Sequence, residues 1–357
     1  MAENGYSLVK GLRKQGIDAE LIINSRDFGM AMPMWEDLSL HQDPYKFNIR
    51  EALKHYDLPE WIKIWWNHQK LEDYLSLFYM VKPYDLLHLH PQSPIYMQFA
   101  SKPYIIHEAG WIRALINGTH SAEKLGRRAY ARADAIVMTN PDTYELLMKM
   151  KYRREVFIPF AIDTEKYRPI KVDKKEDLLF FHPTRQTWEV KGNYLLFYAF
   201  AKFIEAGYKA KLRCVRWGFD EEIANAIDLI KKLKIENYVE WVEPYSKPDL
   251  IKAYNESDAV FDQFLLGSSG TTGFETMSCG KPLVIYLNDW NQKCFGEMPP
   301  VLNAQTVEQI FRAMVTLQSS NLRKKLGEMG REFVIKHLHQ DIIASKIIKL
   351  YEEVLER

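Results

Sequence analysis

Short apolar runs alternate along most of the chain with longer segments in which apolar residues recur at helical spacing. The runs with the length of buried strands in the first half are LLHLH (86–90), PYIIH (103–107), AIVMT (135–139) and 156–159. The helical patterns between them cover 93–100, 124–133 and 141–150. Strands that alternate with helices at this spacing predict a mostly parallel sheet with helices on both faces.

A second series of the same kind begins at Leu178, after a charged segment at 170–177 that we interpret as a linker. Its expected strands are 178–183, 212–218, 238–242, 259–261 and 283–286. Its expected helices are 194–205, 221–233, 248–256, 306–317, 322–337 and 342–355. The pattern therefore predicts two α/β domains, which suits a length of 357 residues.

The first 81 residues are less regular. We expect a helix at 7–16, a strand at 19–24, an irregular methionine-containing segment at 25–47 and helices at 49–56 and 61–81. The run WIKIWW at 61–66 fits a buried helix face or an interfacial patch equally well, so peripheral membrane contact stays open.

Composition excludes several classes of protein. There are 48 basic and 47 acidic residues, a net charge of +1, so we expect no nucleic-acid partner. The three cysteines, Cys214, Cys279 and Cys294, are too far apart for a metal-type pair, and a sparse odd count fits a reducing compartment. No apolar run approaches the ~20 residues of a membrane span and no signal-peptide pattern opens the sequence, so we expect a cytoplasmic protein.

The stretch FDQFLLGSSGTTGFETMSCGKPLVIY at 261–286 is the first candidate site. A strand passes through a glycine-rich turn into a short helix, and such a turn offers unpaired N–H groups and the positive end of a helix dipole to an anion. The residues concerned are Gly267, Gly270, Thr271, Thr272, Gly273 and Glu275. The alternative is an ordinary strand-to-helix connection in which Glu275 only compensates the helix dipole.

Two cations form the second candidate site. Arg185 and Lys191 lie six positions apart on one strand-to-helix loop, with Gly192 at the start of the next helix. A planar guanidinium and a point-charge ammonium suit a diphosphate and can stabilise it as a leaving group. A solvated basic loop is the alternative for either residue alone.

Polar residues also gather where the strands of the first half end. Ligands of parallel sheets bind beyond the carboxyl ends of the strands. That rule selects His88, His90, His107, Glu108, Gly110 and Arg113. The cluster HEAGWIR (107–113) combines imidazole, carboxylate, glycine and guanidinium within seven residues, although a lone strand-end histidine is usually structural.

Five short motifs in order resemble the retaining GT-B nucleotide-sugar glycosyltransferases of the large family four (glycosyl transferases group 1). They are ADAIVMTNPD (133–142), IPFAIDTEKYRP (158–169), HPTRQTWEVKGNYLLFYAF (182–200), YNESDAVFDQF (254–264) and GFETMSCGKPLV (273–284). The likeness covers nearly the whole chain and is strongest from 158 to 286. It implies a GT-B fold, with two Rossmann-like domains facing each other across a deep cleft.

The resemblance also implies residue roles. Arg185 and Lys191 match the pair that binds the donor diphosphate, and Glu275 matches the carboxylate that holds the nucleotide ribose, with backbone contacts from Gly273 and Phe274. His107 matches the strand-end histidine near the transferred sugar. The other residues that we place at the acceptor or donor side of the cleft are Glu108, Gly110, Arg113 and Gly5. Such enzymes need no bound metal and no cofactor.

The sequence departs from the family pattern in three places. Gly267 stands where the family commonly has the first carboxylate of its Glu-x7-Glu motif, as in a DQF-type variant, so Asp262 or a backbone amide would take over that contact. Phe160 and Ala161 replace the usual Asn-Gly, which predicts a stiffer hinge. The family's first strand and glycine-rich loop have no counterpart before MAENGYS, so we expect Met1 to be an internal methionine of a longer protein or the first domain to be impaired.

These observations predict three parts. Residues 1–169 form an acceptor-side Rossmann-like domain, residues 170–337 form the nucleotide-sugar domain, and a C-terminal helix at 338–357 packs back toward the first domain. The predicted reaction transfers a hexose-type sugar from a UDP- or GDP-sugar to a glycan or lipid-linked acceptor with retention. A GT-B phosphorylase or synthase and a non-catalytic sugar-nucleotide-binding protein are the alternatives.

Overall fold

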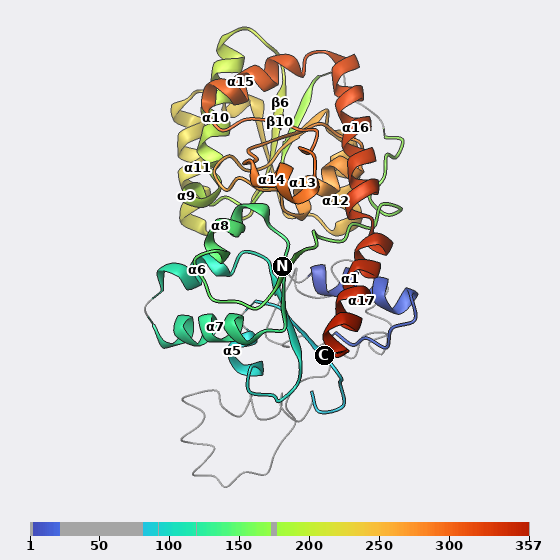
Figure 1. The fold of residues 1–357 in the computed structure, drawn as a ribbon. Helices are drawn as coiled ribbons and strands as arrows, with labels where there is room; N and C mark the ends of the chain where they lie inside the picture. Colours follow the sequence, from blue (N-terminus) through green and yellow to red (C-terminus); the bar gives the residue numbers. More distant parts are fainter. Residues whose placement is uncertain (1–2, 22–80, 92, 119, 173–176, 357) are drawn as a thin grey trace, which may run out of the picture. The chain divides into compact units, whose positions relative to one another are not determined.

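The computed structural model describes residues 3–21, 81–91, 93–118, 120–172 and 177–356. The chain divides into two compact units. Figure 1 colours the chain along its sequence, from blue at the N-terminus to red at the C-terminus. The first unit covers 1–161 and 341–357, and the second covers 162–340. The expected segments at 25–47, 49–56 and 61–80, including WIKIWW, lie outside the described residues.

Within the described part of the first unit, four parallel strands form a sheet in the order β1-β2-β3-β4. The strands are β1 (Leu87–Leu89), β2 (Tyr104–Glu108), β3 (Ala135–Met138) and β4 (Glu155–Phe157). The helices are α1 (Glu3–Lys14), α5 (Pro94–Met97), α6 (Ile112–Asn117), α7 (Ser121–Arg132), the short 3-10 helix η3 (Pro141–Thr143), α8 (Tyr144–Leu147) and α17 (Gln340–Leu355).

Alternate residues of these strands enter two different cores. Ile106 and Ile136 pack with apolar side chains of α5 to α8, whereas Ile105 and Val137 pack with α1 and α17. Successive side chains of a strand point to opposite faces, so helices cover both sides of the sheet. Figure 1 shows α1 beside α17, where Lys14 forms an ion pair with Asp341. The last helix is therefore part of the first unit.

The second unit contains a parallel sheet of six described strands in the order β10-β9-β8-β5-β6-β7. The strands are β5 (Leu179–His182), β6 (Lys211–Val215), β7 (Val239–Val242), β8 (Ala259–Phe261), β9 (Leu283–Ile285) and β10 (Leu302–Asn303). The helices are α9 (Trp188–Lys191), α10 (Asn193–Glu205), α11 (Asp220–Lys232), η4 (Glu236–Tyr238), α12 (Lys247–Glu256), α13 (Thr271–Ser278), α14 (Trp290–Phe295), α15 (Val307–Thr316) and α16 (Ser320–Leu338). Phe180, Phe200 and Phe261 are fully buried in its core.

Three expectations need correction. Residues 19–21, the described part of the strand expected at 19–24, are not in a strand. The helix expected at 141–150 is shorter and divided, because the Pro141 turn forms η3 before α8 begins. Gly5 lies inside α1 and not in a loop before it.

No helix in the described part of the chain is long and apolar enough to cross a membrane.

Candidate functional site: the switch point of the second sheet

The order of strands in the second sheet reverses between β5 and β8. From β5 the chain adds β6 and β7 on one side, and from β8 it adds β9 and β10 on the other. Because β5 and β8 are parallel neighbours, the loops that follow them leave the same edge of the sheet. Ligands of such sheets bind at this switch point. The loop after β5, which includes the short helix α9, carries Arg185 and Lys191, and the loop after β8 leads into α13.

Arg185 lies close enough to Lys191 for its charge to act on the Lys191 ammonium. Lys191 ends the short helix α9, and its backbone oxygen accepts a hydrogen bond from Phe264 N (2.7 Å), which ties it to the loop after β8. Burial lowers the pKa of Lys191 below its usual 10.5, the charge of Asp262 raises it and the charge of Arg185 lowers it. The Arg185 guanidinium is exposed and donates to Thr187 Oγ1 (3.2 Å). Two cations thus share the first loop of the switch point.

The N-terminus of α13 faces the second loop with no side chain as its cap. The first amides of a helix lack intrahelical partners and favour an anion. Thr271 and Thr272 are partly exposed in this first turn, after the buried Ser268 and Ser269. At Gly273, a Cβ would collide with the Ser269 hydroxyl and with Leu283 Cδ2, so a larger residue would force both side chains to move.

Glu275 is held by two residues that the sequence did not identify. Lys247, at the start of α12, donates to Glu275 Oε1 (2.8 Å), and the Tyr254 hydroxyl donates to Oε2 (3.1 Å). Lys247 and Glu275 are only 2% and 4% exposed, and the ammonium also lies 5.5 Å from the centre of the Tyr167 ring. The only local signal was a lysine at the start of a predicted helix, where the dipole disfavours a cation.

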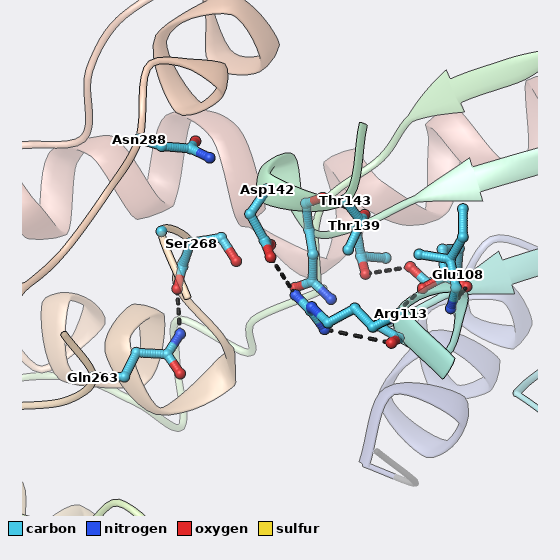
Figure 2. Close-up of polar contacts among 12 residues, drawn as sticks. Glu108, Arg113, Thr139, Asp142, Thr143, Gln263, Ser268 and Asn288 are labelled. Carbon is cyan, nitrogen blue, oxygen red and sulfur yellow. Dashed lines mark hydrogen bonds and ion pairs between the residues drawn. The ribbon is translucent and has the colours of Figure 1, made fainter. Parts of the chain in front are cut away.

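The loop between β8 and α13 is built around Gly267. Its φ of +82° is strained for other residues, and a Cβ would lie 3.2 to 3.3 Å from the Asn288 side chain. Its carbonyl accepts from Asn288 N (2.9 Å) and Asn291 Nδ2 (2.8 Å), and Gln263 donates to the Ser268 carbonyl (Figure 2). A glutamate at this position would therefore strain the backbone and press against the Asn288 side chain.

The Asp262 carboxylate lies close enough to Lys191 to stabilise the charged form of its ammonium. It is 2% exposed, accepts from Thr184 Oγ1 (2.6 Å) and raises the pKa of Lys191. Its expected contact with a donor sugar stays a prediction.

In the first unit, the end of β2 carries the HEAGWIR residues. Glu108 is fully buried and accepts from Gly110 N, Ile112 N (3.2 Å) and the Tyr130 hydroxyl. Burial raises the pKa of its carboxyl, although these hydrogen bonds lower it. Figure 2 shows Arg113 directed toward Asp142, with which it forms an ion pair. Glu108 and Arg113 thus fix the backbone from Gly110 to the start of α6.

His107 lies one residue earlier, beside His88 and His90. It is 5% exposed, and its Nε2 is buried with no hydrogen-bond partner among the described residues. The first unit also brings Gly5 to this cluster, because a Cβ at Gly5 would lie 3.7 Å from His90 Nε2. The structure therefore gathers His107, its neighbouring histidines and Gly5 in one place.

His182, a buried histidine of the second unit, supports the switch point and predicts a pH effect. His182 Nδ1 donates to Phe261 O (2.8 Å), and His182 Nε2 accepts from Asn193 Nδ2 (2.9 Å), which is the arrangement of a neutral ring. Burial lowers the pKa of His182 from 6.5 to about 4. Below pH 6.5 the unfolded chain takes up a proton that the folded chain does not, so stability falls as the pH drops toward 4. From pH 7 to 5.5 we expect a loss of about 1 kcal/mol at this residue, roughly 2 to 4 °C in melting temperature.

The measurement is the change in melting temperature between pH 7 and 5.5 for the wild type, His182→Gln and His120→Gln. His120 is exposed in the first unit and serves as the control. The fall should be smaller in His182→Gln and unchanged in His120→Gln. An equal fall in all three chains would show that the folded chain protonates His182 as readily as the unfolded chain does.

Among the described residues, no group of three or more His, Cys, Asp or Glu side chains could hold a metal ion. The expectation that no metal takes part in the reaction stays a prediction.

Comparison with solved structures decides the fold. The sucrose-phosphate synthase of Thermosynechococcus elongatus matches at 14% identity and a TM-score of 0.70, over 98% of this chain and 92% of that chain. Anabaena HepE in complex with UDP-glucose matches at 13% identity and a TM-score of 0.70, over 99% and 96% of the two chains. A glycosyltransferase from Rickettsia africae matches at 16% identity and a TM-score of 0.69, over 100% and 95%. The chain has the GT-B fold.

The GT-B fold confirms the predicted fold class, whereas family four and the DQF variant stay predictions. No family model and no curated protein matches the sequence. At these identities the likeness establishes the fold alone. The candidate site therefore stands on the geometry of each unit.

Proposed function

We propose that the protein is a retaining glycosyltransferase, which transfers a hexose-type sugar from a UDP- or GDP-sugar to a glycan or lipid-linked acceptor. The observation that carries the proposal is the switch point of the second sheet, where Arg185 and Lys191 share one loop and the uncapped start of α13 follows the other. HepE, a structure of similar fold, was solved with UDP-glucose, which supports a nucleotide sugar as the donor.

The cations bind the donor diphosphate and stabilise it as it leaves. Arg185 supplies a planar fork of donors from the exposed side of the loop, and Lys191 supplies a partly buried point charge. The amides of Thr271, Thr272 and Gly273 add fixed dipoles that cost no reorganisation during the reaction. The acceptor hydroxyl attacks on the face of the sugar that the diphosphate leaves, and the departing phosphate takes its proton.

Glu275 accepts hydrogen bonds from the hydroxyls of the nucleotide ribose. Its oxygens already accept from Lys247 and Tyr254, and each carboxylate oxygen has a further lone pair. The two internal hydrogen bonds fix the carboxylate before the nucleotide arrives, which reduces the ordering cost of binding. His107 orients the transferred sugar.

A thermal-shift screen with UDP, GDP and ADP, followed by their sugars, tests the proposal. A nucleotide present at one hundred times its dissociation constant should stabilise the protein by about 2.7 kcal/mol. The matching nucleotide sugar should then give transfer to an acceptor with retained anomeric configuration, also in the presence of a metal chelator. Absence of a shift with every nucleotide would contradict the proposal.

A non-catalytic sugar-nucleotide-binding protein is the second candidate, favoured by Gly267. The loop is built around this glycine, so it offers no carboxylate at the position where the resemblance expects a contact with the donor sugar. A thermal shift with neither hydrolysis nor transfer of any nucleotide sugar would support that candidate.

A further inference from the structure

Three histidine rings and one tyrosine form a connected cluster in the first unit. His88 lies in β1, His90 directly follows it, and His107 lies in the neighbouring strand β2. The ring centre of His107 is 4.8 Å from that of His90 and 5.2 Å from that of His88. Tyr351 reaches His88 from α17, 263 positions further along the chain.

Two hydrogen bonds connect these side chains in series. The Tyr351 hydroxyl lies 2.6 Å from His88 Nδ1, and His88 Nε2 lies 3.1 Å from His107 Nδ1. The series ends at His107 Nε2, which is buried without a partner among the described residues. Each hydrogen bond holds one proton, and a neutral imidazole carries one N–H. The direction of the hydrogen bond between Tyr351 and His88 therefore determines the direction of the hydrogen bond between His88 and His107.

The directions of the pKa shifts indicate that His88, His107 and Tyr351 are all uncharged at neutral pH. Burial and the charge of His90 lower the pKa of His88 to about 3, and burial lowers the pKa of His107 well below its usual 6.5. Burial raises the pKa of Tyr351, so its hydroxyl keeps the proton. A phenol is the more acidic donor of the first pair, and an imidazole nitrogen is the better acceptor, so the hydroxyl donates to His88 Nδ1.

We propose that Tyr351 is a positioning residue that acts through His88 and fixes the tautomer of His107 with its proton on Nε2. His88 then donates from Nε2 to His107 Nδ1, and His107 presents an N–H group at its buried end. A ligand group that binds to His107 Nε2 must then be a hydrogen-bond acceptor, such as a sugar hydroxyl or a phosphate oxygen. His107 is thereby a hydrogen-bond donor and not a general base.

This inference deepens the proposed function, since a donor at His107 suits a sugar that must be oriented. Its test does not depend on activity. The full-length protein, labelled with ¹⁵N-histidine, is observed by long-range ¹H–¹⁵N correlation, in which protonated and bare ring nitrogens are well separated. His107→Gln and His88→Gln identify the signals. In the wild type, we expect both His88 and His107 to be protonated on Nε2.

Tyr351→Phe removes the donor at the start of the series, and Tyr104→Phe is the matched control. Tyr104 is buried in the same unit, and its hydroxyl donates to Ala129 O (2.7 Å) outside the cluster. Tyr351→Phe should shift the His107 signals toward a mixture of tautomers, whereas Tyr104→Phe should leave them unchanged. A bare Nε2 of His107 in the wild type, or unchanged His107 signals in Tyr351→Phe, would overturn the inference.

Activity gives an independent second readout. Tyr351→Phe should lower turnover about tenfold, the effect of one lost hydrogen bond, with little change in nucleotide binding. In a His107→Gln background it should have no further effect, because the glutamine amide always carries N–H groups. Expected spectra without any transfer activity would refute the proposed function and leave the tautomer assignment intact.

Discussion

Replacement of Lys191 by alanine is expected to lower turnover by about two to three orders of magnitude, the usual cost of removing one preorganised donor from a developing negative charge. The residue lies on the switch-point loop, and none of the described residues forms a hydrogen bond or ion pair with its ammonium. Its charge is therefore available to a ligand. Steady-state kinetics with the nucleotide sugar found in the thermal-shift screen measure the effect.

Lys209→Ala is the matched control, because it removes an exposed lysine charge from the same unit. It should change turnover little, since exposed charges are screened. Lys191→Arg gives a further check on the pH profile. The lowered pKa of Lys191 means that wild-type turnover falls as the pH rises through a value below 10.5, and an arginine should move this fall to higher pH. Full activity in Lys191→Ala would exclude the role.

The sequence was sufficient for the features that depend on short-range pattern. Apolar runs alternating with helical periods predicted both parallel sheets, and the GT-B fold was confirmed by comparison. Arg185, Lys191 and the start of α13 were selected as candidates because they follow strands, and the carboxyl ends of parallel strands share one edge. The predicted sheets therefore also predicted that these loops would meet.

Contacts between residues far apart in the sequence could not be predicted. Lys247 and Tyr254 hold Glu275 from 28 and 21 positions away, and their helix carries no pattern that points to a carboxylate. Tyr351 meets His88 only because α17 packs on the first sheet beside α1. The divided helix at 141–150 depends on η3, a choice between two close helical geometries that periodicity does not resolve.

Replacement of Lys247 by methionine is expected to destabilise the protein by about 3 to 5 kcal/mol, because it leaves the Glu275 carboxylate buried without its cation. Lys247 and Glu275 are 2% and 4% exposed, so water cannot readily take the place of the ammonium. Methionine keeps the volume of the lysine stem, and the loss therefore reports on charge. Chemical denaturation monitored by circular dichroism measures it.

Lys202→Met is the control for the loss of a paired lysine. Lys202 and Glu308 form an ion pair in the same unit, but their side chains are 47% and 46% exposed, and such exposed pairs contribute little to stability. Adding Glu275→Gln to Lys247→Met should restore most of the lost stability, because the amide is neutral and its oxygen can still accept from Tyr254. Equal costs for Lys247→Met and Lys202→Met would show that the Glu275 charge is not buried.

The double variant also separates the two roles of Glu275. If the carboxylate only supports the fold, a stable Lys247→Met/Glu275→Gln protein should bind nucleotide as the wild type does. If it holds the ribose, the variant should fold but lose most of the nucleotide-dependent rise in melting temperature, because a single neutral oxygen replaces a charged acceptor with two oxygens. We expect the second result, since a carboxylate fixed by Lys247 and Tyr254 is already oriented before the ligand binds.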